Sequence, residues 1–134
     1  STSFLFTPSK TLDWKFFLLV ASGGAIGSVL RGLISYFCRS WLPWPTILVN
    51  VLGAFLIGIC IKHWEQNCES ELFRAFWIIG LCGGFTTFST FGLDALNFLK
   101  SAQWGNAFIY IMLNFLGTLF AIYLGFRLYS WASS

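Results

Sequence analysis

The sequence predicts an all-α integral membrane protein with four transmembrane helices. Hydrophobic residues make up 57 % of its 134 residues, and charged residues only 10 %. A soluble domain of this size carries about 25 % charged residues, because polar side chains must cover its surface. The few charges gather between long uncharged stretches, and small residues recur at helix-packing spacing within those stretches. Lipid is therefore the expected solvent for most of this chain.

Four stretches carry no charged residue at all, namely 16–30, 41–61, 75–93 and 101–126. A spanning helix needs about 20 mostly apolar residues. We therefore expect spans over about Trp14–Phe37, Thr46–Ile61, Phe73–Leu99 and Trp104–Trp131. This assignment places Arg31 inside the first span and Asp94 inside the third. Residues 1–13 are predicted to form an N-terminal tail and residues 14–134 a single membrane domain, with no cleavable signal peptide.

The connections between the spans set the expected orientation. A turn containing Trp41, Pro43, Trp44 and Pro45 suits the lipid headgroup layer, and the polar residues 62–74 are predicted to form an aqueous loop. Lysine and arginine near the span ends number five on the side of the termini (Lys10, Lys15, Lys62, Arg74 and Arg127) and two on the other side (Arg39 and Lys100). Because positive residues are retained in the cytoplasm, this excess favours both termini there, and without Lys10 and Lys15 it falls to three against two.

Several functional classes find no support in the residues. The four cysteines (Cys38, Cys60, Cys68 and Cys82) lack CxxC spacing, so we expect neither a disulfide framework nor a metal cluster. His63 is the only histidine and the spans contain no paired carboxylates, so no enzyme active site is predicted. The net charge of +3 is small and dispersed, which argues against a nucleic-acid partner.

Small residues step by four along three of the spans. The pairs are Gly23 with Gly27 and Gly80 with Gly84, and the series Gly117, Ala121 and Gly125 continues the pattern in the fourth span. Such faces let helix backbones approach closely in lipid, so we interpret them as helix-packing surfaces.

Polar residues inside the second and fourth spans form two stripes. Thr46 and Asn50 share one helix face, and Tyr110, Asn114 and Thr118 share another. All of them can donate hydrogen bonds without carrying a charge. Such residues either hold helices together or offer donors to a solute that crosses the membrane, and the pattern leaves both interpretations open.

The third span contains an unusual segment, GLCGGFTTFSTFG, over residues 80–92. Two adjacent glycines followed by hydroxyl residues make a poor continuous helix, so we predict a break at 83–86. A break inside a membrane is tolerated only where protein or an aqueous cavity surrounds it. Phe88 and Phe91 would share one face after the break, where their electropositive ring edges could contact a small anion or simply face lipid.

These segments resemble the bacterial Fluc (CrcB) fluoride-channel family. The matching residues are Gly23-Gly-Ala-Ile-Gly27 followed by Arg31, the segment TILVNVLG over 46–53, and the segment GLCGGFTTFSTF over 80–91. The similarity extends over all four spans, from about residue 16 to residue 128. The GGxTTFSTF pattern is its most specific part.

The resemblance implies a fluoride-selective channel that passively exports fluoride from the cytoplasm through the inner membrane of a bacterium. It further implies an antiparallel, dual-topology homodimer with two pores. A sodium ion would lie at the dimer centre, held by the backbone carbonyls of Gly83 and Thr86.

The resemblance also assigns expected roles to individual residues. Asn50, Phe88 and Phe91 would contact fluoride, and Ser89 and Thr90 would lie near the central part of the pathway. Thr46 joins the expected pathway, and Tyr110, Asn114 and Thr118 would form its polar track, although the family often has a serine at the position of Asn114. Arg31 and Asp94 would act in a vestibule or in the scaffold.

The main alternative is a small four-span drug/proton antiporter. Such a transporter needs a membrane-embedded carboxylate that exchanges protons for a cationic substrate. The first span has no carboxylate after Asp13, and Asp94 comes late in the third span. A membrane enzyme or an assembly subunit is a further alternative, and the absence of a catalytic cluster disfavours it. A channel is therefore the favoured prediction.

Overall fold

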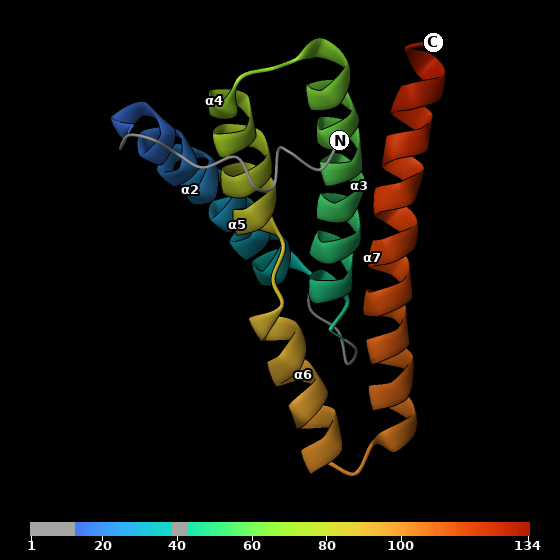
Figure 1. The fold of residues 1–134 in the computed structure, drawn as a ribbon. Coiled ribbons are helices and arrows are strands. Elements are labelled where there is room, and N and C mark those ends of the chain that lie inside the picture. The colour runs from blue at the N-terminus through green and yellow to red at the C-terminus, as the bar shows by residue number, and fades with distance from the viewer. Residues whose placement is uncertain (1–12, 39–42) are drawn as a thin grey trace.

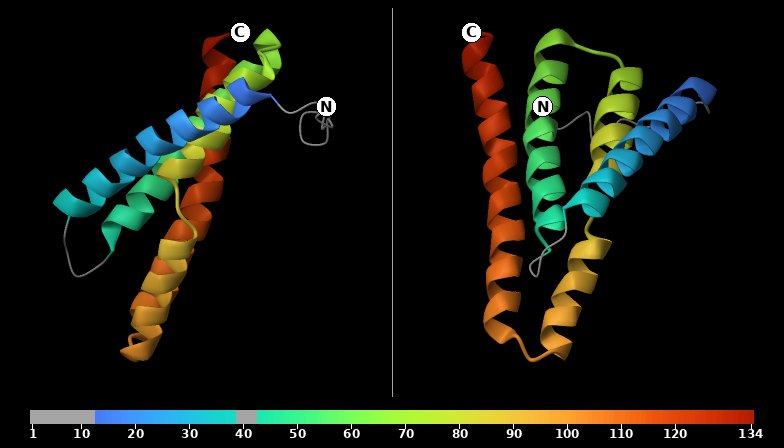
Figure 2. Two further views of the ribbon diagram at one scale, coloured as in Figure 1. Left: turned by 90° about the vertical axis from the view of Figure 1, so that its left-hand side faces the viewer. Right: turned by 180° about the vertical axis from the view of Figure 1, so that it is seen from behind.

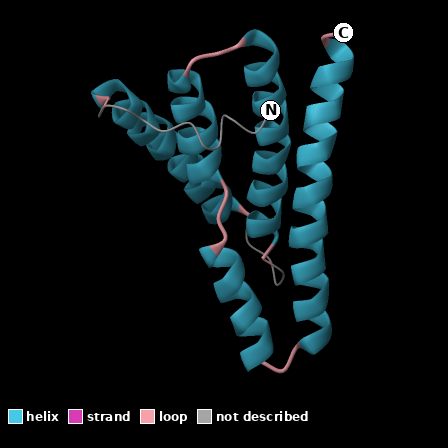
Figure 3. Cartoon of the chain, viewed as in Figure 1, coloured by secondary structure: helices cyan, strands magenta, loops and turns pink. Residues whose placement is uncertain are grey.

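The computed structural model describes residues 13–38 and 43–134. The chain forms α2 (Trp14–Phe37), α3 (Trp44–Asn67), α4 (Glu71–Phe73), the π-helix η1 (Arg74–Cys82), α5 (Gly83–Phe85), α6 (Ser89–Lys100) and α7 (Trp104–Ala132), as shown in Figure 1. Short loops connect these helices in the described part of the chain (Figure 3). Residues 1–12 of the predicted tail and Trp41 of the predicted turn lie outside the described residues, as do Lys10 and Arg39.

The prediction of four membrane-spanning helices is confirmed. The segments Trp14–Phe37, Trp44–Asn67, Glu71–Lys100 and Trp104–Ala132 are each long and apolar enough to cross a bilayer. Many large apolar side chains on these helices are exposed, including those of Phe17, Leu52 and Phe120. In a soluble protein such surfaces would be buried, whereas lipid solvates them. The chain is a multi-pass membrane protein.

The predicted loop over 62–74 is wrong in its extent. Helix α3 continues six residues beyond Ile61 to Asn67, and only residues 68–70 separate it from α4. The added turns pack along α7: the ring centres of His63 and Tyr129 are 5.6 Å apart, and the Lys62 ammonium lies 5.1 Å from the centre of the Phe126 ring. These contacts keep a polar segment helical, because the long side chains can lie along apolar surface while their charged ends reach water.

The helices pack through the small residues that the spacing singled out. Helix α3 lies beside α7, and α2 crosses η1 and α5 (Figures 1 and 2). A Cβ atom added at Gly125 would collide with the Phe55 carbonyl oxygen, and one added at Gly27 would collide with the Leu81 carbonyl oxygen. At these crossings backbone lies directly against backbone, as the small-residue spacing predicted.

The third span is not one continuous helix. Helix α5 ends at Phe85, Thr86 is extended (φ −88°, ψ 158°), and α6 begins at Ser89. We call residues 86–88 the interruption. Gly83 and Gly84, which the sequence placed in a break at 83–86, are themselves helical. Gly84 instead lets α5 approach α2, because a Cβ atom there would lie only 2.6 Å from the Gly24 carbonyl oxygen.

The two halves of the third span have different neighbours. The half before the interruption lies against α2, whereas α6 lies against α7, to which it is joined by a short turn (Figure 2). The π-helical winding of η1 was not predicted, since no residue pattern in 74–82 distinguishes it from an ordinary helix.

Candidate functional site

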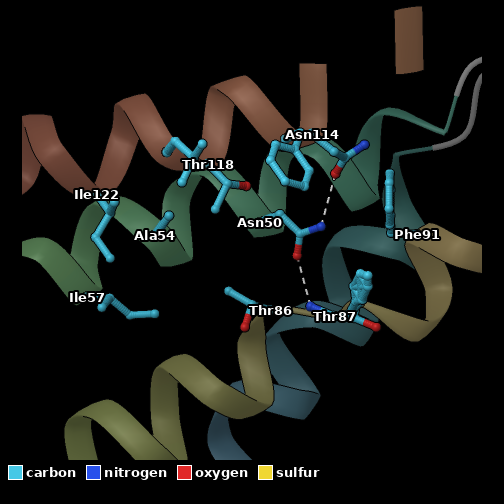
Figure 4. Close-up of a pocket in the computed structure, with 12 residues that line it drawn as sticks. Asn50, Ala54, Ile57, Thr86, Thr87, Phe91, Asn114, Thr118 and Ile122 are labelled. Carbon is cyan, nitrogen blue, oxygen red and sulfur yellow. Dashed lines mark hydrogen bonds between the residues drawn. The ribbon is translucent and has the colours of Figure 1, made fainter. Parts of the chain in front are cut away.

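A pocket of about 320 Å³ lies where the interruption faces α3 and α7 (Figure 4). Its polar lining comes from Asn50, Thr86, Thr87, Asn114 and Thr118. Its apolar lining comes from Ala54, Ile57, Phe88, Phe91, Phe115, Leu119 and Ile122. No Asp, Glu, Lys or Arg is among these residues, so the pocket wall is electrically neutral.

Asn50 occupies the centre of the polar lining. Its side-chain oxygen Oδ1 accepts the backbone N–H of Thr87 at 2.8 Å, and its Nδ2 donates to Oδ1 of Asn114 at 3.0 Å (Figure 4). In an uninterrupted helix the Thr87 N–H would bond the carbonyl of Gly83. The interruption frees this donor, and the Asn50 side chain from another span takes it.

Two backbone groups, the Thr87 N–H and the Tyr110 carbonyl, fix the orientation of the side-chain amides of Asn50 and Asn114. The Thr87 N–H requires an acceptor, so Asn50 must present its oxygen there and its NH₂ group toward Asn114. Asn114 then accepts with Oδ1, and its own Nδ2 donates to the Tyr110 carbonyl at 3.1 Å. The resulting chain of hydrogen bonds runs in one direction, from the interruption to α7.

Two donors in this pocket have no acceptor among the described residues. An amide NH₂ group has two N–H donors, and Asn50 uses only one of them in the chain of bonds. The hydroxyl of Thr118 likewise has no partner within the described part of the chain. A small anion in the pocket would therefore meet neutral donors that are already oriented.

The two phenylalanines predicted on one face do come together at the pocket. The ring centres of Phe88 and Phe91 are 5.4 Å apart, and Phe91 in turn stacks on Tyr110 at 5.7 Å. Phe88 is 73 % exposed on the single chain. Their edges are electropositive, so they add to the donors that an anion could meet.

Tyr110 and Thr46, by contrast, do not line the pocket. The Tyr110 hydroxyl donates to Oδ2 of Asp94 at 2.6 Å, and the Thr46 hydroxyl donates to the same oxygen at 2.8 Å. Asp94 comes from α6, which packs beside α7 and so places its carboxylate next to both hydroxyls. The expected polar track of Tyr110, Asn114 and Thr118 is thus divided, and only its second and third members reach the pocket.

Ser89 and Thr90 also lie outside the pocket lining. The Thr87 hydroxyl accepts the backbone N–H of Thr90 at 3.2 Å, which satisfies one of the unpaired donors in the first turn of α6. Ser89 is exposed, with its hydroxyl 3.4 Å from that of Thr87. In this chain these hydroxyl residues shape the start of α6.

Thr86 and Thr87 are pocket residues whose side chains the sequence did not single out. The Thr86 hydroxyl donates to the Cys82 carbonyl at 3.0 Å, and its methyl group lies where a Cβ atom at Gly53 would stand. Gly53 therefore leaves room for Thr86 beside α3. The run of hydroxyl residues could have predicted that these two side chains line a site. The apolar lining residues could not have been predicted, because their sequence pattern is that of ordinary lipid-facing residues.

Arg31 lies on the α2 side of the third span, outside the pocket lining. Its Nε donates to the Gly84 carbonyl at 3.0 Å, near the end of α5. Arg31 is partly buried. Of the two roles that the sequence suggested, this bond belongs to the scaffold.

The resemblance assigned a sodium ion to the backbone carbonyls of Gly83 and Thr86, and the structure bears on the first of these. The Gly83 carbonyl has lost its helical donor, because Thr87 donates to Asn50 instead. The space beside Gly83 is open, since a Cβ atom there would have no closer neighbour than the Ile78 carbonyl oxygen at 3.7 Å. Within the described residues no three His, Cys, Asp or Glu side chains gather into a metal site. Backbone oxygens suit a hard monovalent cation better than a transition metal.

Comparison with known proteins gives consistent matches over most of the chain. Residues 18–126 match the family described as "CrcB-like protein, Camphor Resistance (CrcB)". The fluoride-specific ion channel FluC of Shewanella baltica is 44 % identical over 115 residues, which cover 83 % of this chain and 93 % of that protein. Proteins of the same name are 39 % identical in Thermus thermophilus (116 residues; 84 % and 93 %) and 36 % identical in Agrobacterium fabrum (115 residues; 82 % and 92 %).

Proposed function

The chain belongs to the CrcB family, and from that membership and its uncharged, mostly apolar pocket with a few hydrogen-bond donors we propose that it is a fluoride channel. It exports fluoride passively from the cytoplasm across the inner membrane of a bacterium. The observation that carries this proposal is the Asn50 side chain, which the Thr87 N–H orients so that its NH₂ group is directed into the pocket lining. The name shared by the similar proteins supplies the identity of the anion.

Neutral donors suit the transport of a strongly hydrated anion. Fluoride must exchange its water for other donors, yet it must also leave each site quickly enough to conduct. The second N–H of Asn50 and the hydroxyl of Thr118 offer such donors without a full positive charge. A lysine or arginine in the same place would hold the ion too tightly.

The rings of Phe88 and Phe91 complete the proposed fluoride site. Their edges carry partial positive charge, whereas an aliphatic side chain of similar volume carries almost none. Phe91 is held in place by stacking on Tyr110, so its orientation does not depend on the ion. Tyr110, Thr46 and Asp94 then act by positioning α6, and Ser89 and Thr90 by shaping its first turn.

The working unit is proposed to be an antiparallel, dual-topology homodimer with two pores. The exposed apolar residues that border the pocket, Phe88, Phe115 and Leu119, support this arrangement, because a second copy would close the pocket against lipid. The carbonyls of Gly83 and Thr86, duplicated by the partner, would supply four oxygens for a structural sodium ion. Such an ion would stabilise the two interruptions against each other.

The antiporter alternative is not favoured by the surroundings of Asp94. This carboxylate lies within the third span but accepts hydrogen bonds from Thr46 and Tyr110 and does not line the pocket. A carboxylate that exchanges protons for a cationic substrate must be reachable by both.

The test is fluoride efflux from liposomes that contain the purified protein, with chloride efflux and drug-cation uptake measured in parallel. We expect fluoride efflux alone. Asn50→Asp should abolish it, because a carboxylate presents only acceptors and a negative charge to the anion. Asn97→Asp is the matched control, since Asn97 is exposed on α6 outside the pocket lining, and it should conduct like the parent.

Cation uptake without fluoride efflux would reject the channel proposal. If the parent conducts and Asn50→Asp conducts equally well, Asn50 is not part of the pathway. Size-exclusion chromatography of each variant establishes that a loss of efflux does not come from a loss of assembly.

A further inference from the structure

The interruption removes two helical hydrogen bonds. In an uninterrupted helix the Thr87 N–H would bond the Gly83 carbonyl, and the Phe88 N–H would bond the Gly84 carbonyl. In the structure one group of each lost bond has a side-chain partner instead. Asn50 of α3 accepts from Thr87 at 2.8 Å, and Arg31 of α2 donates to the Gly84 carbonyl at 3.0 Å. Two side chains from two different spans thus each satisfy one group of a lost helical bond.

Arg31 has no carboxylate partner in the described part of the chain. The carboxylates found paired there are Glu71, bound by Arg74, and Glu69, in contact with His63, both near the connection between α3 and α4. A cation within a membrane span is costly unless carbonyl groups or water compensate it. The carbonyls at the C-terminal end of a helix carry partial negative charge, so the end of α5 stabilises the guanidinium.

We propose that Arg31 is a positioning residue of the pore, which keeps the third span open by occupying the Gly84 carbonyl. With Arg31 bound, the Gly84 carbonyl has a donor without a helical bond from the Phe88 N–H, and the chain turns at Thr86 toward the pocket. Asn50 holds the same segment from the opposite side through Thr87. The two bonds together place Thr86 and Thr87 in the pocket wall and leave the Gly83 carbonyl free. This inference depends on the proposed function only where fluoride flux is the readout.

The chemistry of the arginine side chain permits a decisive set of substitutions. The donor atom is Nε and not the terminal nitrogens. A glutamine carries its amide nitrogen the same number of bonds from the backbone as the arginine Nε, but it has no charge. A lysine keeps the charge but carries a methylene group at that position. Arg31→Gln therefore keeps a donor at the Nε position without the charge, Arg31→Lys keeps the charge but moves its donors one bond farther from the backbone, and Arg31→Met keeps neither.

The experiment measures fluoride efflux and amide hydrogen exchange for all three variants in the full-length reconstituted protein. We expect Arg31→Gln to behave like the parent in both assays. Arg31→Lys and Arg31→Met should lose about tenfold in efflux, and exchange at the Thr87 amide should accelerate by about tenfold, as loss of the hydrogen bond made from the Nε position implies. Arg127→Met, which removes an exposed arginine near the end of α7, controls for loss of charge and should change neither readout.

The opposite order of variants would overturn the proposal. If Arg31→Lys keeps parental efflux and Arg31→Gln loses it, Arg31 acts by attracting anions and not by positioning the backbone. If Arg31→Met exchanges and conducts like the parent, the bond to Gly84 has no role. Should Arg31→Met fail to fold, the comparison of glutamine with lysine still decides. If the parent itself does not conduct fluoride, the proposed function fails, while hydrogen exchange still tests the positioning role.

Discussion

The two halves of the third span are held in different ways. Before the interruption, η1 and α5 lie against α2 with backbone touching backbone, because glycines on both sides leave no side chain between them. After the interruption, α6 is held by side chains: Asp94 accepts from Thr46 and Tyr110, and Phe91 stacks on Tyr110. One half is thus fixed by the absence of side chains, and the other by specific hydrogen bonds and ring contacts.

This difference predicts different responses to substitution. A backbone contact in lipid cannot absorb an added atom, so changes before the interruption should affect folding first. A contact made by side chains can lose one bond and keep the others, so changes after the interruption should leave the bundle assembled and either lower its stability moderately or alter the pocket. The interruption lies between the two halves. Substitutions there can change the lining of the pocket while the helices stay packed.

The largest expected effect is that of Gly27→Ala. A Cβ atom at Gly27 would collide with the Leu81 carbonyl oxygen and lie 2.8 Å from the Phe85 nitrogen, and neither backbone atom can move alone. We expect destabilisation of about 1–3 kcal/mol or loss of assembly, measured by thermal unfolding in detergent and by size-exclusion chromatography. Gly32→Ala on the same helix meets nothing within 4 Å, so it should be neutral or slightly stabilising. Equal stability of both variants would contradict the backbone-contact interpretation.

A large loss of fluoride efflux is expected for Phe88→Ile and Phe91→Ile, with assembly retained. Isoleucine keeps much of the apolar volume but removes the electropositive ring edge. Liposome efflux measures the loss, and chromatography checks the assembly. Phe120→Ile is the control, because Phe120 is an exposed residue of α7 outside the pocket lining. Parental efflux from both pocket variants would make these rings packing residues and would remove them from the proposed pathway.

A moderate effect on stability is expected for Asp94→Asn. One carboxylate oxygen accepts from both Thr46 and Tyr110, and an amide oxygen accepts more weakly because it carries no full charge. We expect a loss of about 1–2 kcal/mol, seen as a lower midpoint of thermal unfolding. A parental midpoint would show that ring stacking alone holds α6 against α7.

The smallest effect is expected for Tyr110→Phe. This change removes one of the two hydroxyl donors to Asp94 but keeps the ring that stacks on Phe91 and packs against Phe98. The expected loss of stability is about 1 kcal/mol or less. Fluoride efflux should stay close to parental, because the hydroxyl does not line the pocket. Abolished efflux would instead place this hydroxyl on the ion path, as the polar stripe first suggested.

Much of the molecule could be predicted because its signals are local. Uncharged stretches gave the four spans, and the ends of the third and fourth differ from those of the helices by at most two residues. The spacing of the glycines predicted where helix backbones meet. Glycines that repeat on one face of a membrane helix indicate that another helix packs closely against that face. The family resemblance rested on short segments, and the comparison with known proteins confirmed it.

The predictions that changed concern where helices end and which donors stay free. The glycine pair suggested a break at 83–86, yet Gly83 and Gly84 are helical, and the break lies at residues 86–88. The second span was expected to end at Ile61, but its polar continuation packs along α7. In both cases a neighbouring helix outweighed the local preference of the residues.

The sequence by itself determined the membrane class, the four spans and a supply of neutral donors at helical spacing. Only the tertiary structure decided which of those donors can meet an ion. Tyr110 and Asn114 share one stripe, yet the first is bound by Asp94 and the second joins Asn50 at the pocket. The partners lie far apart in the chain: 48 residues separate Thr46 from Asp94, and 64 separate Asn50 from Asn114. Periodicity places a residue on a face of its own helix, but a hydrogen bond depends on what another span brings to that face.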